Sequence, residues 1–200
     1  MTASRTRRDA AFRFMSRLFG GGRVRETVTT TVRLDSDPAS VWNRLLFYEE
    51  VPGRPAWLLR VLLPRPVRTE GDKRRIGAIV RCAYSDGNLA KRITAVDAPH
   101  VLRFEVVEQR LGIESCIVTA GGSYSILDCD GATDVALMTN YEAYLRPRSL
   151  WRHLEARLVN QLHRHILSGI STAVLRRDPA ICPAGPKAAA PPTTRPGALA

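Results

Sequence analysis

The sequence predicts an α+β fold in which a curved antiparallel β-sheet wraps around a long C-terminal helix. Two switches of hydrophobic period indicate this fold: the segments after residue 26 alternate with period two, and the segment after residue 146 follows the helical period. Short turn sequences separate consecutive strands, which is typical of an antiparallel meander. A sheet and an amphipathic helix of this kind cover each other's apolar faces.

The length of 200 residues, 44% of them hydrophobic, is enough for one domain with a substantial core. We expect a basic arm over residues 1–25, a folded domain over residues 26–176 and a disordered tail over residues 177–200. The tail is rich in Pro and Ala and has almost no large apolar residue, so burial does not offset the entropy lost on ordering it.

The basic arm contains a pattern that predicts a short amphipathic helix, which the glycines at 20–22 end. Arg13 and Arg17 face away from the apolar side. A basic amphipathic helix fits an anionic membrane surface or an organelle address, and the alternative is an arm that simply covers the domain. The apolar arc consists of Ala11, Phe12, Met15, Leu18 and Phe19.

A strand and a short helix are predicted to open the domain. ETVTTTVRL is β-branched with period two, and DSDPASVWNRLL follows it with Asp37 as the N-cap and Pro38 as the first helical residue. After the Pro/Gly-rich connection VPGRPAW and the segment LLRVLLPRPV, further strands are predicted at IGAIVRCAY, LAKRITAV, VLRFEVVEQ, ESCIVTA with GSYSIL, and DVALMTNYEAYL.

The last predicted element is a helix of about 25 residues. It has Pro147 near its first turn and continues without a breaker to Gly169. Its apolar residues recur every four positions, at Leu150, Leu154, Leu158, Leu162 and Ile166.

The net charge of +11 belongs mostly to the two ends of the chain. Residues 1–25 carry +6 and residues 176–200 carry +3, which leaves only +2 on the part between them. A nearly balanced domain argues against a nucleic-acid partner, although binding of nucleic acid or an anionic membrane through the basic ends stays open as an alternative.

No motif predicts a metal site, and we expect no cofactor. The sequence has no CxxC pair, no zinc spacing of Cys and His, and no GxSxG, P-loop, GxGxxG or HExxH motif. It also has no apolar run of 18 residues, and Arg13 and Arg17 interrupt the apolar core that a secretory signal needs. We therefore expect a cytoplasmic protein with reduced cysteines, peripheral at a membrane if the arm binds one.

The strands place several candidate site residues on predicted inward faces. Alternation puts Tyr84, Phe104, Glu108 and Tyr141 on faces that they share with apolar residues. A tyrosine donates a hydrogen bond to a ligand, and a carboxylate in an apolar pocket has a raised pKa that suits acid or base chemistry. The alternative for each tyrosine is ordinary core packing.

The two histidines of LHRHIL point about 200° apart on a helix, so they cannot chelate one ion. With Leu158 as the origin and 100° per residue, Trp151, Glu155 and His165 fall on the predicted inward arc, while His163 lies about 140° away at its margin. We expect His165 to face the sheet, either as a ligand contact or as a buried group with a protein partner.

At DPASVWNRL, DAPHVLRFEV and the closing helix, the sequence resembles the START-like or SRPBCC superfamily, which has the helix-grip fold. LLPRPVRTEGDKRRIGA, AKRITAV, FEVVEQRLGIE and GGSYSI are also similar to a bacterial group labelled polyketide cyclase/dehydratase family protein. The resemblance covers about residues 26–172 and implies a hydrophobic tunnel between sheet and helix.

Two functions follow from this resemblance. The first is binding of a lipid, quinone or polyketide-like molecule in the cavity. The second is cyclase or dehydratase chemistry at the same place, with His165, Glu108 and Tyr141 as the candidates for moving protons.

Overall fold

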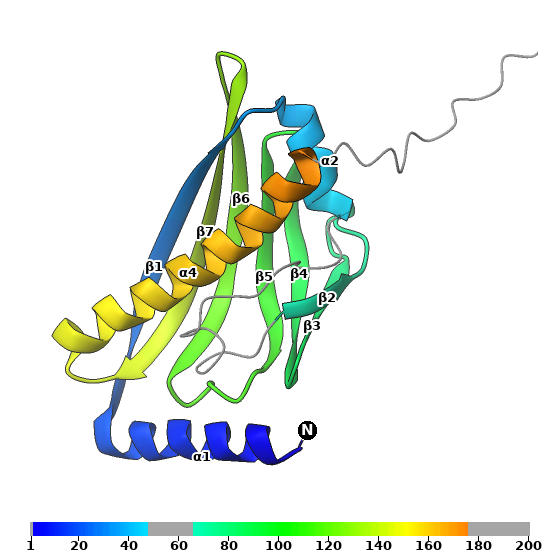
Figure 1. Ribbon diagram of the computed structural model, residues 1–200. Helices are drawn as coiled ribbons and strands as arrows, with labels where there is room; N and C mark the ends of the chain where they lie inside the picture. The colour runs from blue at the N-terminus through cyan, green and yellow to red at the C-terminus, as the bar shows by residue number, and fades with distance from the viewer. Residues whose placement is uncertain (1, 48–65, 176–200) are drawn as a thin grey trace, which may run out of the picture.

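The computed structural model describes residues 2–47 and 66–175, which form one antiparallel sheet with a long helix across its face (Figure 1). The predicted tail over residues 177–200 and most of LLRVLLPRPV lie outside the described residues. In chain order the elements are α1 (Thr2–Phe19), β1 (Gly20–Leu34), α2 (Pro38–Phe47), β2 (Pro66–Glu70), β3 (Ile79–Tyr84), β4 (Gly87–Asp97), β5 (Val101–Arg110), β6 (Ile117–Cys129), β7 (Ala132–Leu145) and α4 (Arg148–Leu175).

The sheet has seven strands in the order β1-β7-β6-β5-β4-β3-β2, and every neighbouring pair is antiparallel. The long helix α4 crosses one face of this sheet, and α2 packs beside its C-terminal half (Figure 1). The predicted α+β helix-grip architecture is therefore confirmed.

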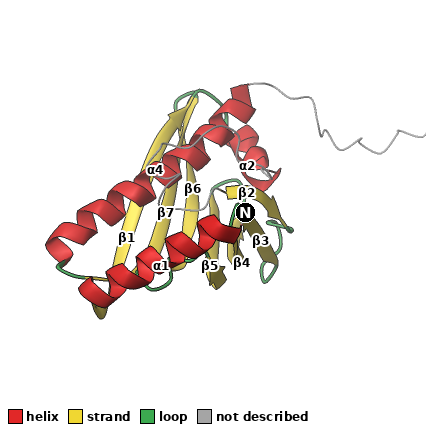
Figure 2. Ribbon diagram, turned by 60° about the horizontal axis from the view of Figure 1, so that its bottom comes forward, coloured by secondary structure: helices red, strands yellow, loops and turns green. Residues whose placement is uncertain are grey.

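Helix α1 lies across one end of the sheet, as the second view shows (Figure 2). Phe12 packs against a buried cluster that includes Leu111 and Ile113, and the Cys116 thiol lies 3.6 Å from the Phe12 carbonyl oxygen. The predicted short helix is thus longer than expected, and it covers the end of the sheet where the β5–β6 connection lies.

The predicted cap of α2 is present. The backbone N–H of Ser40 donates to Asp37 Oδ1 at 2.9 Å, and Pro38 is the first helical residue. The hydrogen bonds from Ser40 lower the pKa of the Asp37 carboxyl below its ordinary value. A capping carboxylate of this kind satisfies a backbone donor that has no partner inside the helix.

The long helix continues past Gly169, where the sequence predicted its end. Leu167 and Ile170 on either side are buried at 1% and 0% exposure in the main core. Burial of such side chains outweighs the helix penalty of a single glycine, which is about 1 kcal/mol.

Two glycines allow β6 to pass close to both of its neighbours. A Cβ atom at Gly121 would collide with the carbonyl of Phe104, and one at Gly122 would collide with the carbonyl of Met138. The register between β6 and β7 shifts between Thr119 and Gly121, which marks a bulge. A bulge next to glycines bends a strand, so ESCIVTA and GSYSIL contribute to one curved strand.

Strand β2 was not predicted, because PVRTE begins with a proline and has a single further apolar residue. It pairs with β3 alone at the end of the strand order. Edge strands tolerate proline and carry little periodic signal.

Candidate functional site

A mostly apolar cavity lies between the sheet and α4. It has two lobes, with volumes of about 100 Å³ and about 70 Å³. On its α4 side the larger lobe is lined by Leu158, Leu162 and His163, among others. The lobes adjoin, because the residues that line both of them are Tyr84, Lys91, Phe104, Tyr124 and Ile166.

Of the residues that the structure describes, two lysines line this cavity: Lys91 lines both lobes, whereas Lys73 lines only the smaller one and donates to the Leu45 carbonyl at 3.0 Å. Lys91 follows the inward alternation of β4 between the buried Leu89 and Ile93, and its Nζ lies 4.4 Å from the centre of the Phe104 ring. Desolvation is the largest cause acting on the pKa of Lys91 and lowers it, while Cys82 and the nearby tyrosines raise it above its ordinary value through the charges that they acquire when they ionise at high pH. At neutral pH the Lys91 ammonium has no such charge beside it from the tyrosines.

Two tyrosines flank Lys91. Burial raises the pKa of Tyr84 to about 12, and Lys91 opposes that shift only in part. Burial raises the pKa of Tyr124 as well. Both side chains are therefore uncharged phenols at neutral pH, and they offer hydrogen bonds without a negative charge.

His163 is the second polar group of the cavity, and it links three elements. The Thr30 hydroxyl donates to Asn160 Oδ1 at 2.6 Å, so it accepts from His163 Nδ1 at 2.9 Å. The opposite nitrogen, Nε2, then accepts from the Thr139 hydroxyl at 2.8 Å. Burial, with a smaller contribution from the charge of Lys91, lowers the pKa of His163 to about 4. The ring is neutral at pH 7, and both of its nitrogens have protein partners.

Tyr141 lines the larger lobe beside an ion-pair network at the start of α4. Burial, followed by the negative charges of Glu155 and Glu26, raises the pKa of Tyr141 to about 12. Tyr141 is therefore neutral at pH 7 and suited to hydrogen bonding rather than to proton abstraction.

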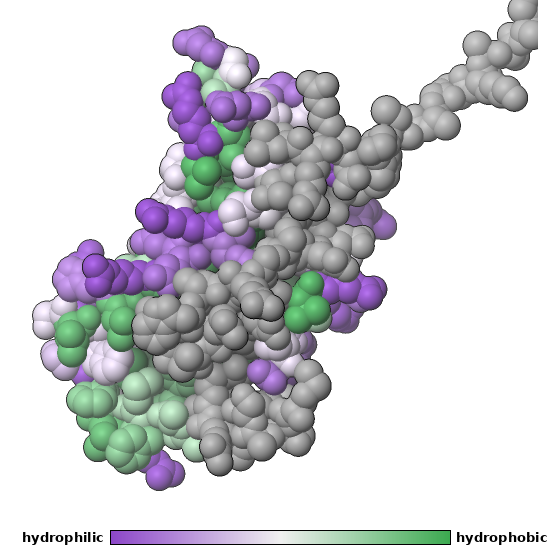
Figure 3. Space-filling view, in the orientation of Figure 1, coloured by the Kyte–Doolittle hydropathy of each residue, from purple (hydrophilic) through white to green (hydrophobic). Residues whose placement is uncertain are grey.

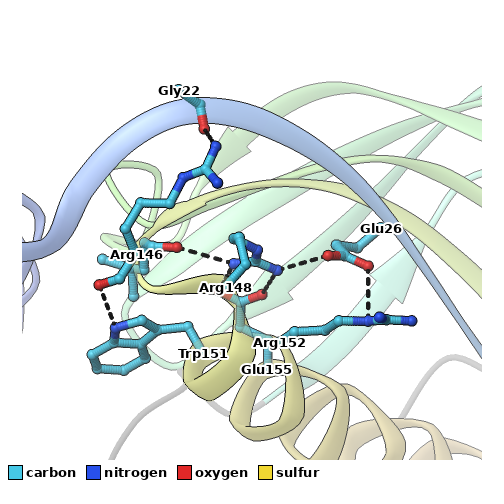
Figure 4. Close-up of polar contacts among 8 residues, drawn as sticks. Gly22, Glu26, Arg146, Arg148, Trp151, Arg152 and Glu155 are labelled. Atoms are coloured by element: carbon cyan, nitrogen blue, oxygen red, sulfur yellow. Dashed lines mark hydrogen bonds and ion pairs between the residues drawn. The ribbon is translucent and has the colours of Figure 1, made fainter.

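The network joins α4 to β1 (Figure 4). Arg148 holds both oxygens of the buried Glu155 at 2.9 Å and 2.7 Å, and its Nη2 also lies 2.9 Å from Glu26 Oε1. Arg152 Nε lies 3.5 Å from the other oxygen of Glu26. The hydrogen bond to Glu155 is the largest of the effects that raise the pKa of Arg148. These contacts pair Arg148 and Arg152 with protein carboxylates, although the buried Arg148 Nε has no hydrogen-bond partner among the described residues.

Of the predicted ligand-binding residues, Tyr84, Phe104 and Tyr141 line the cavity, whereas Glu108 does not. Glu108 pairs with Arg110 at 2.7 Å, and its side chain is 42% exposed. The register shifts between Ala90 and Lys91, which lie opposite Glu108 and Val106 respectively, so one extra residue enters β5. That bulge breaks the alternation on which the prediction for Glu108 rested.

The predicted inward arc of α4 was right for Leu158 and Leu162, which line the cavity, and wrong for its first two turns and for His165. A row of residues spaced by four drifts about 40° per step around a helix, so one row cannot stay on one face. Leu150 is 62% exposed and Leu154 is 36% exposed, while Leu158 and Ile170 further along are buried. His163 is therefore the inward histidine, at 2% exposure.

His165, Trp151 and Glu155 do not line the cavity. His165 is half-buried, and desolvation lowers its pKa. Trp151 packs against Phe19 with ring centres 5.6 Å apart, and Glu155 is buried in the network with Arg148. Whether any of the seven predicted residues touches a ligand stays a prediction.

Lys91, Tyr124 and His163 line the cavity but were missed as candidates. A sequence signal for Lys91 exists, since it alternates in phase with Leu89 and Ile93, but two adjacent cations, Lys91 and Arg92, are also typical of a solvated strand end. The inward phase of Tyr124 with Ile126 was also readable from GSYSIL.

Within residues 2–47 and 66–175, no group of three or more His, Cys, Asp or Glu side chains is placed to hold a metal ion. Cys82, Cys116 and Cys129 are free thiols. None of the described helices is both long and apolar enough to cross a membrane.

Comparison with known proteins gives a fold but no close relative. No family model matches the sequence, and no curated protein matches it. Among solved structures, a protein from Thermus thermophilus matches with a TM-score of 0.55 at 17% identity, covering 76% of this chain and 99% of that one. The Zhui aromatase/cyclase from a Streptomyces species matches with a TM-score of 0.55 at 16% identity, covering 77% and 96%.

Norcoclaurine synthase from Thalictrum flavum matches with a TM-score of 0.53 at 12% identity, covering 78% of this chain and 96% of that one. Together with the seven-stranded sheet packed against α4, these matches confirm the helix-grip fold. At such identities the likeness is one of fold, and the function has to be argued from the cavity itself.

Proposed function

We propose that the protein binds a hydrophobic small molecule in the cavity between the sheet and α4. The observation that carries this proposal is a largely apolar lining interrupted by a few polar groups, which include Lys91, Lys73, Tyr84, Tyr124, Tyr141 and His163. An apolar wall supplies affinity, and a few fixed polar groups orient the ligand, which is the usual composition of a small-molecule site. The helix-grip fold of a polyketide aromatase/cyclase supports the same reading.

Acid–base catalysis of the cyclase or dehydratase type has less support from the described residues. His163 is a poor base because its pKa is about 4 and both ring nitrogens are occupied. Of the three predicted candidates, Glu108 and His165 lie outside the lining of the cavity, and Tyr141 lines it with a pKa raised to about 12. These placements favour binding over proton transfer by the candidates that the sequence suggested.

Native mass spectrometry of the purified full chain, followed by organic extraction, tests the binding proposal. We expect a stoichiometric mass increase that disappears on extraction, and an extract that contains a lipid, quinone or polyketide-like molecule. Leu162→Trp, which fills the larger lobe, should abolish the bound mass, and Leu154→Trp on the exposed side of the same helix should retain it. A chain that is always empty, and that no hydrophobic ligand stabilises against heat, would contradict the proposal.

We further propose that the basic arm, residues 5–25, contacts an anionic membrane. The specific observation is an exposed apolar patch that α1 shares with the start of α4 (Figure 3). Phe14 and Leu18 on α1 are 62% and 60% exposed, and Leu150 on α4 is 62% exposed. The ring contact between Phe19 and Trp151 joins the two parts of the patch.

The positive charge beside this patch favours an anionic membrane as the partner. Residues 1–25 carry +6, and Arg13 and Arg17 are exposed among the apolar side chains. Apolar side chains at the level of the headgroups, together with arginines, are the features of an interfacial helix on anionic lipid. A bilayer surface rich in phosphatidylserine or phosphatidylglycerol therefore fits both features.

Co-sedimentation with vesicles tests this contact. We expect binding to phosphatidylglycerol vesicles that weakens as salt is added, and little binding to phosphatidylcholine alone. Phe14→Ser with Leu18→Ser should lower the bound fraction strongly, whereas Leu127→Ser should not, since Leu127 is equally exposed at 61% but lies on β6. Equal binding by all variants would exclude the patch, and binding to duplex DNA in place of vesicles would assign the charge to nucleic acid.

A further inference from the structure

The cavity contains a positive charge that no described carboxylate neutralises. Among residues 2–47 and 66–175, none of the ion pairs involves Lys91. Its neighbour on β4, Arg92, illustrates the contrast, because Arg92 lies on the opposite face and binds Glu105 at 2.7 Å.

The neighbours of Lys91 are apolar or uncharged. Lys91 stands opposite Val80 on β3 and Val106 on β5, so neither flanking strand brings a carboxylate beside it. The Phe104 ring, 4.4 Å from Nζ, attracts a cation but does not neutralise it. The flanking tyrosines are phenols whose pKa burial raises, so they add dipoles and no negative charge.

An ammonium held among apolar side chains is costly unless an anion or several acceptors accompany it. A lysine on a solvated strand end avoids this cost by extending into water. Lys91 instead contacts both lobes of the cavity. The position of Lys91 is therefore explained if the missing anion arrives with the ligand.

We propose that the ligand is an amphiphilic carboxylate whose head group binds the Lys91 ammonium and accepts hydrogen bonds from Tyr84 and Tyr124. Its apolar part extends toward Leu162 and Ile166 on α4. Lobes of about 100 Å³ and about 70 Å³ have room for a small aromatic ring or a short acyl chain. This inference rests on the proposed binding function and adds the charge of the ligand to it.

Matched pairs of ligands test the charge directly. Naphthoate and naphthylmethanol, and octanoate and octanol, differ in the head group while keeping the apolar part. We expect calorimetry with the full chain at neutral pH to show tighter binding of each carboxylate than of its alcohol by about tenfold or more, because hydrogen bonds to a charged group are stronger than neutral ones.

Two variants at Lys91 and one control variant separate the effect of the Lys91 charge on ligand preference from the effect of its side-chain volume. Lys91→Met should remove the preference for the carboxylate while leaving the affinity for the alcohol similar, and Lys91→Arg should retain most of the preference. Arg92→Met, on the opposite face of β4, should behave like the wild type. Removal of the unpaired charge should also raise the melting temperature of unliganded Lys91→Met, which shows that the variant folds.

The possible outcomes distinguish the two proposals. If the wild type binds alcohol and carboxylate equally, or if Lys91→Met keeps the preference, the assigned head group is wrong and the cavity still binds ligands. If none of the four probes binds and the purified chain carries no ligand, the binding function fails and the head-group assignment fails with it.

Discussion

The environment of His163 shows how burial fixes the state of a single residue. Its Nδ1–H donates to Thr30, and its Nε2 accepts from Thr139. The neutral ring thus satisfies two polar side chains, Thr30 on β1 and Thr139 on β7, and protonation would turn Nε2 into a donor that faces the donating Thr139 hydroxyl. Although His163 lines the cavity, its two hydrogen bonds suit it to holding α4 against the sheet rather than to catalysis.

This environment makes stability depend on pH. The folded pKa of His163, about 4, lies below its ordinary value of 6.5. Between these values the unfolded chain binds more protons than the folded one, so stability falls as pH falls. We expect His163 to account for a loss of about 2 kcal/mol in the unfolding free energy between about pH 7.5 and about pH 5.

Urea unfolding at several pH values measures this loss. The wild type should lose more stability than His163→Gln over that interval, because glutamine does not titrate. His153→Gln, at an exposed position of the same helix, should follow the wild type. Parallel pH profiles for all three proteins would show that His163 is not the titrating group.

Among the elements, α4 depends on the ion pairs at its first turn. Arg148 is the shared partner of Glu26 on β1 and of Glu155, whose side chain is 3% exposed. Removal of Arg148 would leave a buried carboxylate without its cation, and such losses cost about 3–5 kcal/mol. We therefore expect Arg148→Met to destabilise the protein severely.

Arg152→Met provides the matched comparison, because Arg152 is 67% exposed and lies 3.5 Å from the same Glu26. Exposed pairs contribute at most about 1 kcal/mol, so this variant should unfold close to the wild type. If the two variants have the same denaturation midpoint, the network does not hold α4 on the sheet.

The sequence predicts where the helices and strands lie better than it predicts which of their side chains point inward. Alternation correctly places Leu102, Phe104 and Tyr141 inward, because regular strands have a period of two. It is wrong for Glu108, because a bulge one residue earlier is set by pairing with β4 and leaves no local sequence signal. The helix phase is wrong for a different reason, since a row spaced by four winds around α4 and its exposed end looks as apolar as its buried end.

At the scale of the whole molecule, charge and cavity are separated. The excess of positive charge lies in the ends of the chain, whereas the cavity between the sheet and α4 has the lysines Lys73 and Lys91 in a mostly apolar lining. This separation supports two contacts of different kinds: a lipid surface at α1 and a small molecule inside the sheet. Phe12 of α1 packs against the cluster of Leu111 and Ile113, which also line the cavity, so the two proposed contacts would lie on neighbouring parts of the molecule.

The sequence predicted that a cavity would exist, because the fold that it resembles has one, but it did not predict the size of that cavity. Its size depends on how the side chains of α4 meet those of β4 to β7, and the register shift in β6 that bends the sheet depends on pairing between residues far apart in the chain. Lys91 was readable as an inward residue by its phase, but its lack of an ion-pair partner among the described residues becomes visible only once the strands are assembled.

Methyl NMR during titration with naphthylmethanol tests the central claim most directly, because it reports where a hydrophobic molecule binds. We expect the methyl signals of Leu137 and Leu162, which line the cavity, to shift, and those of the exposed Leu127 to stay unchanged. Shifts confined to Leu18 and Leu150 on the exposed patch, or no shifts at all, would contradict a ligand site between the sheet and α4.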